Sequence, residues 1–146
     1  MKKAKKVAAL FCALMIVVTL IPTTFAVETK EEFIDLGDGF YAVVTFEQTP
    51  MSHAGDTVSG NKTGKVYQGS VLVGTATMGA TFDISGATAK AKSANVTGTG
   101  SNGWSYDHGT TSLSGNKASG TAYFKKDGVQ KSFTLTITCS PDGTLS

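Results

Sequence analysis

The stretch from Leu72 to Ile84, LVGTATMGATFDI, has the longest regular alternation in the chain. One face carries seven small or apolar residues: Leu72, Gly74, Ala76, Met78, Ala80, Phe82 and Ile84. The opposite face is mostly threonine, together with Val73 and Asp83. A period of two over this length predicts a β-strand with one buried face and one solvated face.

Shorter stretches on both sides repeat this pattern between turn signals. We expect strands over 33–36, 40–48, 87–92, 117–124 and 133–139, and a further strand opening at Val66. Glycine-rich turns are expected at 37–39, 68–70, 85–86, 98–103 and 126–128. The phase slips at Ser93-Ala94, which predicts a β-bulge. The segment 49–64 is polar and rich in turn residues, so no strand is expected there.

Seven or eight short strands and no helix after residue 26 predict an all-β fold. Antiparallel strands with one dry face pack naturally as two sheets, so we expect a small β-sandwich, with a small β-barrel as the alternative. Gly, Ser and Thr are abundant in residues 27–146, which suits short strands and turns better than helices.

The first 26 residues have the three parts of a secretory signal peptide. Four lysines lie within the first six residues, an apolar run follows from Val7 to Ile21, and small residues precede a cut at about Ala26–Val27. The run is shorter than the roughly 20 residues of a membrane span. We therefore expect export, no stable membrane span after cleavage, and one domain over 27–146.

Removing the signal leaves nine lysines, no arginine and eleven carboxylates, a net charge of about −2. A nucleic-acid partner requires surplus cations and usually arginine, so we expect none. Only Cys139 remains of the two cysteines, which excludes an intramolecular disulfide. Its phase with Phe133, Leu135 and Ile137 predicts a buried thiol, and an intermolecular disulfide is the alternative.

Residues 53–62 and 108–117 resemble each other, with matching His, Ser, Gly, Asn and Lys. This echo favours an internal duplication, and its Ser-Gly-Asn-Lys core favours a turn in both copies. It also pairs the two histidines, His53 and His108, which are weak candidates for a metal site or for acid–base chemistry. No third ligand is evident, and we expect no cofactor.

Other candidate residues lie between Gly100 and Thr111. Trp104 and Tyr106 occupy alternate positions, where exposed rings would form a binding patch; the alternative is that Trp104 closes one end of the core. Ser105, Asp107 and His108 resemble a catalytic triad in composition only, because neighbouring strand residues point to opposite faces.

The chain resembles a loose group of small secreted proteins from Gram-positive gut bacteria. The resemblance lies in four short stretches, Leu36–Tyr41, Gly103–Ser105, Ser114–Ala118 and Thr138–Pro141. It implies secretion and a compact β domain, and it supplies no catalytic or binding residue.

Without a trusted catalytic motif, we expect a secreted, non-enzymatic binding or interaction module, outside the cell or at its envelope. A cell-wall glycan or a protein are the expected partners. The alternatives are a small secreted antagonist resembling a bacteriocin, and a metal-binding or hydrolytic protein that uses His53 and His108.

Overall fold

The computed structural model describes residues 30–47 and 56–146, and most of this part of the chain is β-strand. Eight strands follow one another: β1 (Lys30–Gly37), β2 (Phe40–Glu47), β3 (Thr57–Gln68), β4 (Val71–Asp83), β5 (Lys90–Gly100), β6 (Ser105–Ser114), β7 (Lys117–Lys126) and β8 (Val129–Thr138). No helix long and apolar enough to cross a membrane occurs in these two ranges.

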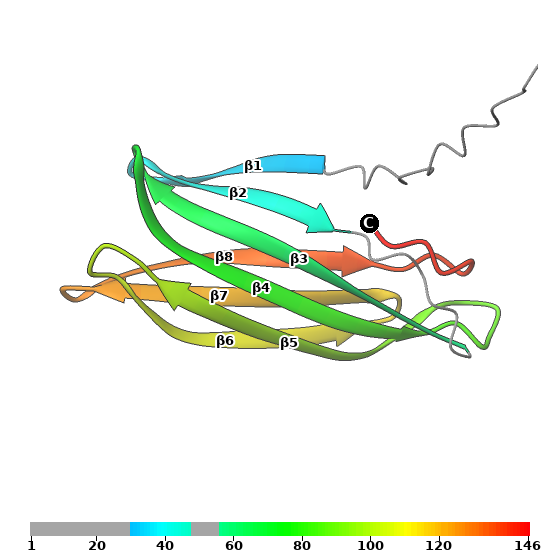
Figure 1. Cartoon of the computed structure of the whole chain (residues 1–146). Coiled ribbons are helices and arrows are strands. Elements are labelled where there is room, and N and C mark those ends of the chain that lie inside the picture. The colour runs from blue at the N-terminus through cyan, green and yellow to red at the C-terminus, as the bar shows by residue number, and fades with distance from the viewer. Residues whose placement is uncertain (1–29, 48–55) are drawn as a thin grey trace, which may run out of the picture.

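The strands form two antiparallel sheets that face each other (Figure 1). The first sheet has the order β1-β2-β3-β4-β5 and the second the order β6-β7-β8. The sheets are not joined into a closed barrel, so the predicted all-β sandwich is confirmed. Because each neighbour in a sheet is also the next strand along the chain, every connection within a sheet is a hairpin.

The core lies between the sheets and consists of the inward-facing alternate residues. Phe82, Met78 and Phe124 are among its largest fully buried side chains. The predicted inward set on β8 is confirmed, and its last member, Cys139, which directly follows β8, is a buried free thiol. On β4 the expected phase fails at its start: Val73 is buried and Leu72 is not. A register shift against β3 at Val66 and Tyr67 reverses the alternation there.

The first copy of the internal echo lies inside a strand, and the turn expected there is wrong. Residues 59–62 belong to β3, in the stretch where no strand was expected. Its glycines face the core: a Cβ at Gly60 would collide with Leu145, and one at Gly64 with the Phe133 ring. Gly60 therefore makes room for a side chain of the C-terminal segment, and Gly64 for a side chain of the opposite sheet.

The second copy of the echo does form a turn. Gly115 has a φ of 56° and connects β6 to β7, as the Ser-Gly-Asn-Lys pattern predicts. The matching residues thus have different structural roles, and the duplication itself stays a prediction. The bulge expected at Ser93-Ala94 is present one residue earlier, where Lys92 has no partner between Ala91 and Ser93.

The turns divide between the two ends of the sandwich. The β1–β2, β3–β4, β5–β6 and β7–β8 turns all lie at one end, called the turn end below (Figure 1). All four use left-handed backbone: Gly69 in the β3–β4 turn, and in the others Asp38 (φ 54°), Asn102 (φ 53°) and Asp127 (φ 49°) beside glycines. The chain's C-terminal segment lies at the opposite end, called the tail end below (Figure 1).

Candidate functional site

An open cleft of about 430 Å³ lies at the turn end, called the turn-end cleft below. Its lining comes from four separate parts of the chain: the β1–β2 turn with the start of β2, the end of β3, the segment before β6, and the β7–β8 hairpin. The residues are Asp38, Phe40, Gln68, Trp104, Lys126, Asp127, Val129, Gln130 and Lys131. Apolar rings and convergent polar groups in one concavity are typical of a ligand site.

Lys131 connects the two sheets across this cleft. Its ammonium donates a hydrogen bond to the Asp38 carboxylate at 2.8 Å and lies 4.7 Å from the centre of the Phe40 ring. The hydrogen bond and the positive charge of Lys131 lower the pKa of Asp38 below its usual value. The Lys131 side chain is 17% exposed and that of Asp38 is 84% exposed, so the ion pair forms the rim of the cleft.

Trp104 closes one end of the core, which confirms the second of the two expectations for this residue. It is 8% exposed and meets Phe40 edge-on, with ring centroids 5.6 Å apart. A short turn holds it, because its backbone N–H donates to the Ser101 carbonyl. Trp104 therefore lines the turn-end cleft without projecting from the surface.

Tyr106 does not join Trp104 in an exposed patch, so that expectation is wrong. Its ring packs over Gly98 and lies edge-on to Phe124, with centroids 5.9 Å apart. Its hydroxyl donates to the Val96 carbonyl, and burial raises the pKa of Tyr106. Tyr106 thus packs β6 against β5 and does not line the cleft.

Asp107 and His108 form a hydrogen-bonded pair on the outer face of the second sheet. A bulge between Tyr106 and His108 breaks the alternation, so these neighbours meet at 2.8 Å and do not point to opposite faces. The expectation of opposite faces is therefore wrong. The His108 ring stacks on Tyr123, and both members of the pair are exposed. Within the described residues no hydrogen bond links Ser105 to them.

The proposed pairing of His53 with His108 is not tested, because His53 lies outside the described residues. Among residues 30–47 and 56–146, no group of three or more His, Cys, Asp and Glu side chains could hold a metal ion. Cys139 is fully buried, and burial raises the pKa of its thiol. Such a thiol is a poor nucleophile.

Sequence reasoning missed most of the lining of the turn-end cleft. Gln68, Lys126 and Lys131 carry no motif, and each is an ordinary polar residue near a strand end. Their one shared signal is proximity to a predicted turn. A turn predicts a strand end but does not indicate which strand ends lie together in space.

Comparison of the chain with protein-family models, with curated proteins and with solved structures finds no match.

Proposed function

We propose that the chain is a secreted, non-enzymatic β-sandwich that binds its ligand through the turn-end cleft, outside the cell or at the cell envelope. The observation that carries the proposal is the composition of this cleft. Two aromatic rings, two amides, two lysines and two carboxylates come together there from four parts of the chain. Export rests on the sequence of residues 1–26.

A cell-wall glycan is the ligand that this lining fits best. Sugar hydroxyls both donate and accept hydrogen bonds, and the amides, ammonium groups and carboxylates of the cleft offer partners of both kinds. The apolar face of a sugar ring can pack on the exposed Val129, above the small part of the Trp104 and Phe40 rings that lines the cleft. An exposed side chain such as Val129, which is 50% exposed, would be covered by such a ligand.

The proposal of a non-enzyme rests on the position of the one pair with triad-like chemistry. Asp107 and His108 lie on an exposed outer face and outside the lining of the cleft. A general base needs a bound substrate within hydrogen-bonding reach, and an open sheet face does not hold one in place.

The test is binding of the purified protein to intact peptidoglycan and to a panel of soluble glycans. We expect binding that weakens by about tenfold or more in the double variant Gln68→Ala/Lys126→Ala, which removes two hydrogen-bonding groups worth about 1 kcal/mol each. Both residues lie at strand ends, so the fold should survive.

Lys117→Ala is the matched control, because Lys117 lies on β7 like Lys126 but at the tail end. It should bind like the wild type. Absence of binding to any wall fraction or glycan would overturn the glycan proposal and favour a protein partner or an antagonist role. Equal binding by the double variant would show that the ligand site lies elsewhere.

A further inference from the structure

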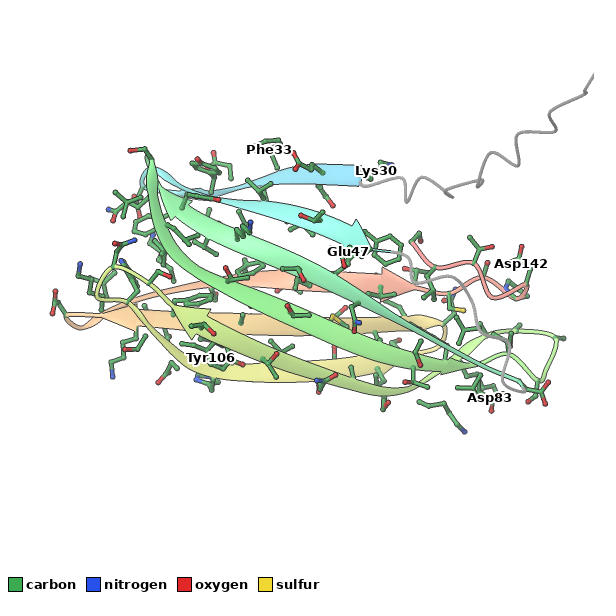
Figure 2. All side chains as sticks on the ribbon, in the orientation of Figure 1. Lys30, Phe33, Glu47, Asp83, Tyr106 and Asp142 are labelled. Carbon is green, nitrogen blue, oxygen red and sulfur yellow. The ribbon has the colours of Figure 1, made fainter. Side chains whose placement is uncertain are left out.

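A second cleft, of about 370 Å³, opens at the tail end between the first sheet and the chain's C-terminal segment. It lies near the ends of β1 and β2, which Lys30 and Glu47 mark in Figure 2. Its size is at the lower end of the range for small-molecule sites. Its lining residues are Lys30, Glu31, Glu32, Val44, Phe46, Lys62 and Ser146.

Lys62 occupies an inward position of β3, where an apolar side chain is expected. The inward series of this strand runs through Val58, Gly60, Gly64 and Val66, which are all buried. Lys62 lies in register between Phe46 on β2 and the buried Met78 on β4. A lysine is almost never placed toward a core unless its charge meets a partner.

The partners of Lys62 in the structure are neutral. Its ammonium donates to the Thr136 carbonyl of the opposite sheet at 2.6 Å and lies 5.3 Å from the centre of the Phe46 ring. No ion pair joins it to a carboxylate of the described residues. Since an ammonium carries three donors, two remain for a ligand. Partial burial lowers the pKa of Lys62, as is expected for a charge without a counter-ion.

The other charges of this cleft lie at its rim. Lys30, Glu31 and Glu32 are all exposed, on the edge strand β1, so solvent screens their fields. Glu32 acts on Lys62 through space, raising its pKa, but less strongly than burial lowers it. Among the lining residues, the charged side chain that a ligand meets inside the cleft is therefore Lys62, and Ser146 of the C-terminal segment completes the lining.

We propose that the tail-end cleft binds a small amphipathic carboxylate, whose head group pairs with the Lys62 ammonium while its apolar chain lies along Phe46 and Val44. A carboxylate supplies the counter-charge that Lys62 lacks, and a charge-assisted hydrogen bond in a partly dry cleft is stronger than one on the surface. The apolar walls gain from covering a hydrocarbon chain. This site is separate from the turn-end cleft, so either can exist without the other.

The test is titration of the purified protein with octanoate, followed by calorimetry and by amide chemical shifts. We expect saturable binding, with shifts concentrated at Val44, Phe46 and Lys62. Lys62→Met keeps an unbranched apolar side chain and removes the charge, and should weaken binding at least about tenfold, since a hydrogen bond to a charged group contributes about 1.5–3 kcal/mol. Circular dichroism checks that the variant is folded.

Lys65→Met is the matched control, because Lys65 lies on the same strand, is exposed, and has the opposite orientation. It changes the net charge equally and should bind octanoate like the wild type. Equal affinity of the wild type and Lys62→Met would overturn the proposal.

Two further ligands test the sign of the charge. Octanol should bind more weakly than octanoate, and octylammonium should bind weakest of the three. Tighter binding of octylammonium would mean that Glu31 and Glu32 dominate, and this would overturn the proposal even if Lys62→Met failed to fold. Shifts spread over the surface, with no saturation, would overturn it as well.

Discussion

Each end of β2 carries a phenylalanine beneath a lysine ammonium, and the two pairs differ in what else the lysine meets. At the turn end, Lys131 lies over Phe40 and forms an ion pair with Asp38. At the tail end, Lys62 lies over Phe46 and donates to a backbone carbonyl of β8. Both lysines connect the five-stranded sheet to β8, which is an edge strand of the three-stranded sheet. Lys131 lies on β8 and reaches the β1–β2 turn, whereas Lys62 lies on β3 and reaches β8.

Lys131 therefore has a counter-ion within the fold, whereas Lys62 has none among the described residues. Asp38 lies in the left-handed β1–β2 turn, and its carboxylate accepts a hydrogen bond from Lys131. The carbonyl of Thr136 carries only a partial negative charge, so Lys62 keeps most of its electrostatic potential. We therefore interpret Lys131 as part of the framework of one cleft and Lys62 as the ligand-binding group of the other.

The largest expected difference is in the loss of stability when each of the two phenylalanines is replaced by alanine, because they are buried to different extents. Phe40 is 5% exposed and supports Trp104, whereas Phe46 is only partly buried. Phe40→Ala should lower the free energy of unfolding by about 3–5 kcal/mol, and Phe46→Ala by about half as much, in proportion to the area removed. Urea unfolding of both variants measures this. A larger loss for Phe46→Ala would contradict the comparison.

The pH dependence of the free energy of unfolding should show that the Lys62 ammonium has no counter-ion. The pKa of Lys62 is lowered by burial from 10.5, so near neutral pH the folded state bears the penalty of a partly buried cation. As pH rises toward 10.5, the folded state releases its proton before the unfolded state does, and the penalty is relieved. Lys62→Met lacks this penalty. Its stability advantage over the wild type should therefore shrink as pH rises.

Urea unfolding of the two proteins across this range measures the difference between them. Tyr106 and Cys139, whose pKa values burial raises, are common to both and cancel in the comparison. An advantage that stays constant, or grows with pH, would mean that Lys62 bears no such penalty.

Removing the Asp38–Lys131 ion pair should have the smallest effect on the free energy of unfolding. Asp38 is exposed, so solvent screens its attraction to Lys131, and Asp38→Asn should leave the free energy of unfolding near neutral pH within error of the wild type. The pKa of Asp38 is lowered, so any stabilisation it gives is present above its unfolded value and is lost as pH falls. A loss comparable to that of Phe46→Ala would contradict the expectation that solvent screens this ion pair.

Much of the fold could be predicted because it depends on local pattern. The period of two in β8 and in β4 from Gly74 onward, and the turn at Asp127-Gly128, are set by neighbours along the chain, and the structure agrees with them. The prediction from local sequence was wrong at two glycines. Gly60 and Gly64 resemble turn residues in sequence, but each lies in a strand, where Gly60 makes room for Leu145 of the C-terminal segment and Gly64 for Phe133 of the facing sheet.

The candidate sites could be predicted least. Of the residues that line the turn-end cleft, only Trp104 was singled out, and Lys62 was part of a predicted turn. Asp107 and His108 were expected to point apart, and a single bulge brings them together. A bulge, like a cleft, depends on pairing with distant strands.

The sequence by itself determined that most of the described residues form short antiparallel strands, with Cys139 and most of the alternate apolar residues inside, because side-chain direction in a strand follows from position alone. Only the tertiary structure decided that one sheet has five strands and the other three. Because the first sheet has two more strands than the second, the sandwich is open on the side of the edge strand β8. Lys131 and Lys62 both make their contacts along this side. The contacts involved join residues far apart in the chain, so no local pattern encodes them.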